Sequence, residues 1–330
     1  MSSELHAAIR ELLLHATAVR VVSHIRPDGD AVGSLLGLGL ALENSGKQVE
    51  MVLNDGVPLS FRHLAGSEKI TRSSKLKDPF TVVVDCSDQV RAGQVLEGVV
   101  VDLNIDHHVT NLNFGKVNFV QPSAVATAAI LTEFLPIWGF EITQPCASAL
   151  LTGLVSDTLG FRTSNMNPQA LRLAAQLMER GANLSELYFQ ALVKRSMKSA
   201  QFWGYGLQRM MLEDQLLWTS LTQEDRQAAS YPGNDDADLV NLLSTIDEAV
   251  IAIIFVEQKG GQVKISWRSR LGWDVSQLAL QFGGGGHPAA AGAEIFGSLE
   301  EVQDKVLTAT RMFMQEKRGT ISPTGTNSKG

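Results

Sequence analysis

Four short clusters of acidic and imidazole side chains in the first half of the chain have the composition of a metal-binding site. Their members are His24, Asp28, Asp30, Asp85, Asp106, His107, His108 and Asp157. Carboxylate and imidazole groups are ligands of Mn²⁺ and related divalent ions, and they also serve Zn²⁺ and Fe²⁺. Such mixed sets, shared between two ions about 4 Å apart, are the usual centre of metal-dependent phosphoester hydrolysis.

Each cluster taken alone also has a simpler interpretation. The loop 24–30 reads equally as a solvated turn with a helix N-cap at Asp30. Taken alone, Asp85 could be a helix or turn cap, and the two histidines could be partly exposed loop residues. Asp157 could be an ordinary loop residue at the C-terminal end of a helix. Adjacent side chains on an extended backbone point to opposite sides, so we expect one histidine to bind metal and the other to face substrate. The four clusters together favour the metal site.

The elements around the clusters predict a sheet whose strand ends carry them. Apolar, β-branched runs predict strands at 19–23, 50–53, 81–84 and 99–105. Helical signals lie at 31–44, 123–135, 145–154 and 168–180. This alternation predicts a doubly wound, mostly parallel α/β sheet, and ligands bind such sheets at the carboxyl ends of the strands. The glycines within 31–44 predict close packing of that helix on a neighbour.

The second half predicts a smaller α/β domain that begins near Leu216. Strands at 250–256 and 262–268 are joined by a hairpin-like turn. The second strand has an apolar face and a polar face that ends at Arg268 and Ser269. A guanidinium at that position suits two-point contact with a phosphate, and a solvated strand end is the alternative.

A glycine run at 283–286 precedes His287. Successive glycines let backbone N–H groups approach a phosphate, and we expect the start of a following helix to add its dipole. A flexible loop is the simpler interpretation. Within the run, the candidate ligand-binding residues are Gly284, Gly285 and Gly286.

Composition sets limits on the function. The chain has 330 residues, of which 44% are hydrophobic and 19% charged, so it is long enough for about two globular domains. Its two cysteines suit a reducing compartment, and we expect a cytoplasmic protein. No apolar stretch is long enough to predict a membrane span. The net charge of −7 argues against a long nucleic-acid groove, but not against a short nucleotide held by metals.

The order of these motifs resembles the DHH phosphoesterase family, named for its Asp-His-His triplet. The likeness covers nearly the whole chain, and the run 282–292 resembles the signature of the DHH-associated substrate-binding domain. The resemblance implies a catalytic domain at 1–185, a helical connector at 186–212 and a substrate-binding domain at 213–317. We expect residues 318–330 to be a disordered tail. The segment 121–127 departs from the family pattern, because alanines stand where relatives often carry hydroxyl and acidic residues.

The resemblance also implies a role for each candidate residue. One ion would be held by His24, Asp28 and Asp85, and the other by Asp30, Asp85, His107 and Asp157. Asp106 would orient the histidine pair, and His108 would contact the scissile phosphate or help the leaving oxygen. Arg268, Ser269, Gly284, Gly285, Gly286 and His287 would bind substrate. The resemblance favours Mn²⁺ at both positions, with Mg²⁺ or another divalent ion as the alternative.

Within the family, the length and the glycine-histidine run are most similar to the group that degrades very short RNA (nanoRNA) to mononucleotides and often removes the 3′-phosphate of pAp. We therefore expect a cytoplasmic hydrolase acting on short oligoribonucleotides and nucleotides, without a membrane partner, and with a homodimer implied by relatives alone. A phosphodiesterase for cyclic-di-AMP or pApA is the first alternative. A non-catalytic nucleotide-binding module is the second.

Overall fold

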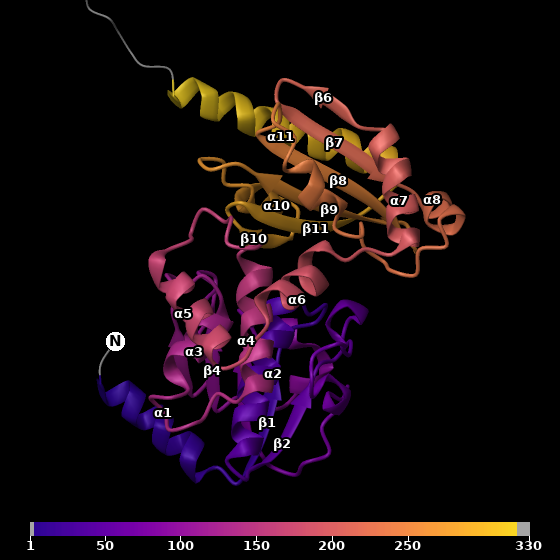
Figure 1. The fold of residues 1–330 in the computed structure, drawn as a ribbon. Coiled ribbons are helices and arrows are strands. Elements are labelled where there is room, and N and C mark those ends of the chain that lie inside the picture. The colour runs from indigo at the N-terminus through magenta and orange to yellow at the C-terminus, as the bar shows by residue number, and fades with distance from the viewer. Residues whose placement is uncertain (1–2, 322–330) are drawn as a thin grey trace, which may run out of the picture. The chain divides into compact units, whose positions relative to one another are not determined.

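The computed structural model describes residues 3–321, which divide between Lys194 and Arg195 into two compact units. The division lies inside the stretch predicted as a helical connector. The elements of the first unit are α1 (Ser3–His15), β1 (Ala18–Val22), α2 (Gly29–Asn44), β2 (Gln48–Val52), η1 (Leu59–Phe61), η2 (Ser67–Lys69), β3 (Phe80–Val84), η3 (Val90–Leu96), β4 (Leu103–Asp106), β5 (Val117–Val120), α3 (Thr127–Phe134), α4 (Gln144–Asp157), α5 (Pro168–Glu179), α6 (Leu184–Tyr188) and η4 (Phe189–Val193). Figure 1 shows their course.

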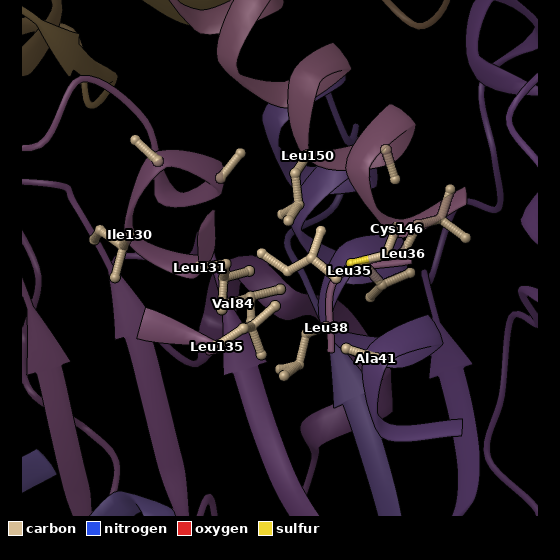
Figure 2. Packing of buried hydrophobic residues seen from close by; sticks show 14 of the residues in the cluster. Leu35, Leu36, Leu38, Ala41, Val84, Ile130, Leu131, Leu135, Cys146 and Leu150 are labelled. Atoms are coloured by element: carbon tan, nitrogen blue, oxygen red, sulfur yellow. The ribbon is translucent and has the colours of Figure 1, made fainter. Parts of the chain in front are cut away.

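The first unit is built on a parallel sheet with the strand order β2-β1-β3-β4-β5. Helices α2, α3 and α4 pack on one face through a large apolar cluster. Figure 2 shows part of that cluster gathered over the strands, with Leu35, Leu36, Leu38, Ala41, Val84, Ile130, Leu131, Leu135, Cys146 and Leu150 labelled. A smaller cluster, which includes Val22, Val83 and Leu96, covers the other face beneath η3. The predicted α/β class is confirmed.

Close packing explains the glycines of α2. A Cβ atom added at Gly33 would lie 2.5 Å from the Ala149 carbonyl oxygen and 2.7 Å from the Gly153 nitrogen, both in α4. The backbones of α2 and α4 therefore touch directly, which a larger residue would prevent. The prediction that these glycines serve packing is confirmed.

Two predicted elements of the first unit are shorter than expected. The strand predicted at 99–105 begins only at Leu103, because Val99 donates to the Leu96 carbonyl and closes a turn. The helix predicted at 123–135 begins at Thr127, because Ala124 donates to Gln121 in a turn and Ala126 is extended.

The second unit has a mixed sheet with the order β10-β11-β9-β8-β7-β6, in which only β7 and β8 pair in parallel. Its elements are α7 (Met197–Gln208), β6 (Met211–Glu213), β7 (Leu216–Leu221), α8 (Gln223–Ala228), α9 (Leu239–Leu243), β8 (Ile251–Gln258), β9 (Gln262–Ser269), α10 (Ser276–Gln281), β10 (Gly285–His287), β11 (Ala290–Phe296) and α11 (Leu299–Ile321). Helices α10 and α11 cover one face, and α7 and α9 cover the other.

Two sequence predictions for the second unit are wrong. The last two glycines of the run, Gly285 and Gly286, belong to strand β10, which pairs with β11, so no helix N-terminus follows the run. The helix α11 continues to Ile321, so residues 318–321 of the predicted disordered tail are helical. The rest of that tail, residues 322–330, lies outside the described residues. Between residues 3 and 321, no helix is both long and apolar enough to cross a membrane.

Candidate metal centre

The sequence-predicted ligands of the first unit meet at the carboxyl ends of β1, β3 and β4. The strand order reverses between β1 and β3, since β2 lies on one side of β1 and β3 to β5 follow on the other. Loops that leave neighbouring strands at such a reversal point diverge and open a crevice. His24 follows β1, Asp85 follows β3, and Asp106 ends β4.

The loop after β1 supplies two of these groups, His24 and Asp28. The His24 ring nitrogen Nδ1 lies 2.8 Å from the Ile25 carbonyl, which can only accept, so Nδ1 carries a proton and Nε2 is the nitrogen that faces the carboxylates. Asp28 is the N-cap of α2, where Oδ1 accepts from the Asp30 and Ala31 amides at 3.0 Å. Its other oxygen, Oδ2, lies 3.9 Å from His24 Nε2. The cap therefore falls on Asp28, not on Asp30, and leaves one oxygen facing the imidazole.

Asp85 lies at the middle of the cluster. Its Oδ2 is 3.6 Å from His24 Nε2, and its Oδ1 is 3.7 Å from His107 Nε2. The residue has a φ of 54°, in the left-handed region that is uncommon for residues other than glycine. Backbone strain of this sort is characteristic of functional sites. The two oxygens of one buried carboxylate thus face two different imidazoles.

Both histidines of the triplet approach Asp85, against the expectation that they point apart. His108 Nδ1 lies 3.8 Å from Asp85 Oδ1, and the two histidine rings are 4.8 Å apart between centroids. Strand β4 ends at Asp106, so the alternation of a strand need not continue to His107 and His108. Asp106 Oδ1 accepts from the His107 amide at 2.8 Å and lies 2.7 Å from His108 Nδ1.

Asp30 and Asp157 complete the cluster from two helices. Asp157 is the last residue of α4, and its Oδ2 lies 3.5 Å from His107 Nε2. Asp30 is fully buried and accepts from the Thr127 amide at 2.6 Å and the Ala128 amide at 2.9 Å. These amides begin α3, so the N-terminus of that helix offsets the charge of Asp30.

Burial and mutual charge perturb most groups of the cluster. Burial, together with Asp85 and Asp157, raises the pKa of Asp30 well above its ordinary value. Burial raises the pKa of Asp157 to about 7, although His107 opposes the shift. Burial alone would raise the pKa of Asp85, but its hydrogen bond with His24 and the charges of the histidines bring it well below its ordinary value.

The pKa values of His24 and His107 are raised, although burial by itself would lower them. Burial would lower the pKa of His24, but Asp85 and Asp28 raise it to about 9. Burial would likewise lower the pKa of His107, but Asp157 and Asp85 raise it to about 9. The cluster therefore holds an excess of negative charge that attracts cations, and a divalent ion relieves that excess directly.

The donor atoms fit divalent cations. Among the described residues of the first unit, three groups of donor atoms lie within 4.8 Å of one another: His24, Asp28 and Asp85; Asp30, Asp85 and His107; and Asp85, Asp106 and His108. Asp85 belongs to each of these three groups, as expected of a bridging ligand. Oxygen and nitrogen donors of this kind suit Mn²⁺ and similar ions.

The candidate substrate residues of the second unit lie around β9 and the hairpin β10–β11. Arg268 Nε donates to Asn241 Oδ1 at 3.0 Å, and Nη1 donates to the Trp267 carbonyl at 3.0 Å, which fixes the guanidinium. The Ser269 hydroxyl lies 2.6 Å from the Trp273 carbonyl and 3.1 Å from the Pro288 carbonyl. Its proton therefore holds the loop, and its oxygen is left to accept from a ligand. His287 is half-buried at the end of β10.

The glycines of the run differ in whether close packing requires a residue without a side chain. A Cβ atom at Gly284 would lie 2.1 Å from the Gly292 carbonyl, and one at Gly286 would lie 2.4 Å from the Ala290 carbonyl. Both glycines therefore allow close approach to β11. A Cβ atom at Gly285 would meet no heavy atom within 4 Å, so close packing does not require a glycine at this position.

Two residues of the centre were not assigned a role from the sequence. The Thr127 hydroxyl donates to Asp85 Oδ1 at 3.0 Å, and Asn111 Nδ2 donates to Asp106 Oδ2 at 2.6 Å. Thr127 lies in the segment where alanines break the family pattern, which obscured it. Asn111 lies three residues after His108 in the sequence. A side-chain amide so close to the triplet was the signal that could have suggested a contact with Asp106.

Comparisons with known proteins agree with this architecture. The model of the DHH family N-terminal domain matches residues 18–154, and that of the DHHA1 domain matches residues 229–316. The chain is 35% identical over 298 residues to the bifunctional oligoribonuclease and PAP phosphatase NrnA of Thermus thermophilus, covering 89% of each. It is 28% identical over 293 residues to the Mycoplasma genitalium protein of that name, covering 87% of this chain and 91% of the relative. An exopolyphosphatase-related protein of Bacteroides fragilis has a TM-score of 0.87 at 22% identity, covering 98% of both chains, and confirms the fold.

Proposed function

Because this chain belongs to the DHH phosphoesterase family, we propose that it hydrolyses short oligoribonucleotides to nucleoside monophosphates and pAp to AMP. The observation that carries the proposal is the buried Asp85 carboxylate, whose two oxygens face His24 and His107. The similarity to an oligoribonuclease and PAP phosphatase along 89% of the chain supports the substrate class.

Two divalent ions fit the cluster, and we propose Mn²⁺ for both, with Mg²⁺ as the alternative. His24, Asp28 and Asp85 would hold the first ion, and Asp30, Asp85, His107 and Asp157 would hold the second. When bound, such ions lower the pKa of water and stabilise negative charge on a phosphoryl group. The protein contributes donors fixed by α2, α3 and α4, so little reorganisation accompanies binding.

His108 is the residue that we propose to act on the leaving oxygen. Asp106 accepts from Nδ1 of this ring and fixes its orientation, while Asn111 donates to the other oxygen of Asp106. The Nε2 atom of His108 is then oriented to donate a proton to the oxygen that departs from phosphorus.

In the second unit, Arg268 and His287 are proposed to bind the phosphates of the nucleotide, together with the Gly285 backbone. The contacts of Arg268 Nε and Nη1 leave its Nη2 edge for a phosphate oxygen. Ser269, Gly284 and Gly286 shape this region through their contacts with the loop 273–288 and with β11. The domain limits 1–185, 186–212 and 213–317 are retained as part of this proposal.

We also propose a cytoplasmic location and a homodimer. Both cysteines are free and buried, which suits a reducing compartment. Light scattering of the purified chain tests the oligomeric state.

The test compares three substrates in Mn²⁺: a diribonucleotide, pAp and cyclic-di-AMP. We expect hydrolysis of the first two, and Asp85→Asn should reduce both rates at least about 100-fold, because both ion positions lose a charged ligand. Asp102→Asn is the matched control, since Asp102 pairs with Lys116 and accepts from the Thr81 amide at the starts of the strands, away from the carboxyl ends that carry the cluster. Cleavage of cyclic-di-AMP alone would refute the proposed substrates, and tight nucleotide binding without turnover would identify a binding module instead.

A further inference from the structure

Thr127 contacts two of the carboxylates in the metal centre. It is the first residue of α3 and is fully buried. Its amide donates to Asp30 Oδ2 at 2.6 Å, and its hydroxyl donates to Asp85 Oδ1 at 3.0 Å. One residue therefore fixes an oxygen from the first turn of α2 relative to an oxygen from the loop after β3.

The amide contact results from an unusual helix start. The residue in the N-cap position of α3 is Ala126, which has no side-chain oxygen, so the first amides of the helix need an acceptor from elsewhere. Asp30 supplies it, with one oxygen on the Thr127 amide and the other on the Ala128 amide. The backbone thus determines the position of Asp30, whatever side chain stands at 127.

The hydroxyl contact determines the orientation of Asp85. Asp85 Oδ1 faces His107 and Oδ2 faces His24, so the plane of this carboxylate decides how it is shared between the two groups of ligands. The carboxylate follows a left-handed backbone and can rotate about its last torsion. A buried hydroxyl at 3.0 Å from Oδ1 restricts that rotation.

We propose that Thr127 is a positioning residue of the metal centre, whose hydroxyl orients the bridging carboxylate of Asp85 before ions bind. This inference rests on the proposed function, because it takes the cluster to be a metal site. Side chains that orient a ligand from behind typically change metal affinity 10–100-fold when removed.

The test measures Mn²⁺ binding to the full metal-free chain by calorimetry, without substrate. Thr127→Val keeps the shape and the amide but removes the hydroxyl, and it should weaken the affinity for Mn²⁺ about 10-fold or more. Thr127→Ser restores the hydroxyl and should bind Mn²⁺ within about threefold of the wild type. Thr132→Val is the matched control, because Thr132 is buried in the same helix and its hydroxyl donates to the Ala128 carbonyl at 2.7 Å.

The outcomes separate this inference from the function on which it rests. If Thr127→Val binds Mn²⁺ as tightly as the wild type, the inference is overturned. It is also overturned if Thr132→Val or Thr127→Ser loses as much affinity, since both variants keep the hydroxyl contact with Asp85. Thermal unfolding of each variant in chelator verifies that the fold is intact. If the wild type itself binds no Mn²⁺, the metal centre of the proposed function is refuted, whereas binding that is insensitive to the hydroxyl refutes only the role of Thr127.

Discussion

Some side chains in the metal centre are held by hydrogen bonds to other protein groups, and Asp106 is the main example. Asp106 accepts from the His107 amide and from His108 Nδ1, and Asn111 donates to its second oxygen. Its main contacts are therefore with the histidine pair. Asp106 is expected to influence proton transfer more than metal affinity.

Asp106→Asn tests that division of roles. The amide can still accept a hydrogen bond, but it places no negative charge beside the His108 ring, so kcat for the dinucleotide should fall by about 100-fold. The affinity for Mn²⁺ should change less than threefold, as measured by calorimetry on the same preparation. A loss of metal binding as large as the loss of turnover would show that Asp106 acts as a ligand.

At the level of helices, the centre depends on the contact between α2 and α4. The N-terminal end of α2 carries Asp28 and Asp30, and α4 ends at Asp157. Gly33 lies against the backbone of Ala149 and Gly153. The two helices are therefore closer together than a side chain at position 33 would allow. This contact fixes the distance between ligands that lie far apart in the sequence.

Gly33→Ala should therefore impair both stability and metal binding. The added methyl group would clash with backbone atoms, so α2 must shift, at a cost of about 1–3 kcal/mol in the free energy of unfolding. Gly204→Ala is the matched control, since a Cβ atom at that position in α7 meets nothing within 4 Å. Denaturant unfolding should show a loss for Gly33→Ala and no loss for Gly204→Ala, because alanine is the better helix former.

Helix α8 offers a pH-dependent contact in the second unit. Asp225 completes a capping box with Thr222 and also pairs with Arg209 at the end of α7. Burial would raise the pKa of Asp225, but Arg209 and Thr222 lower it. A lowered pKa in the folded state means that the stabilisation is present above the unfolded value of about 4 and is lost as the pH falls through the folded value.

Asp225→Asn should accordingly have a lower Tm than the wild type at pH 7. The difference should shrink as the pH falls below about 4, where the wild-type carboxylate also becomes neutral. Thermal unfolding followed by circular dichroism across this range provides the measurement. A difference in Tm that is the same at every pH would show that the charge of Asp225 does not contribute.

For the molecule as a whole, charge should limit the length of the substrate. The net charge of −7 gives a long RNA backbone little attraction, whereas a di- or trinucleotide needs only metals and a few cations. Turnover should fall steadily from dinucleotides to oligomers of about ten nucleotides, at equal concentration of ends. Chromatography of the products from each length tests this, and a preference for the longest oligomers would contradict it.

The sequence predicted the parts of this molecule that depend on local pattern. Apolar runs located the strands, and polar residues directly after them located Asp85 and Asp106 at the same sheet edge. The conformation of single residues was beyond such reasoning: both histidines approach Asp85 beyond the end of β4, and the last glycines of the run pair with β11 as a strand. Thr127 was missed for a similar reason, because its partners are long-range contacts with Asp30 and Asp85.

The two oxygens of Asp28 have different tasks, and this restricts what can replace it during evolution. One oxygen caps α2, and the other faces His24. Serine, threonine and asparagine cap helices about as well as aspartate, but they would bring no negative charge to the imidazole. Glutamate would bring the charge but is a poor cap. Each of these replacements for aspartate therefore fails in one of the two tasks, and position 28 should tolerate almost no substitution.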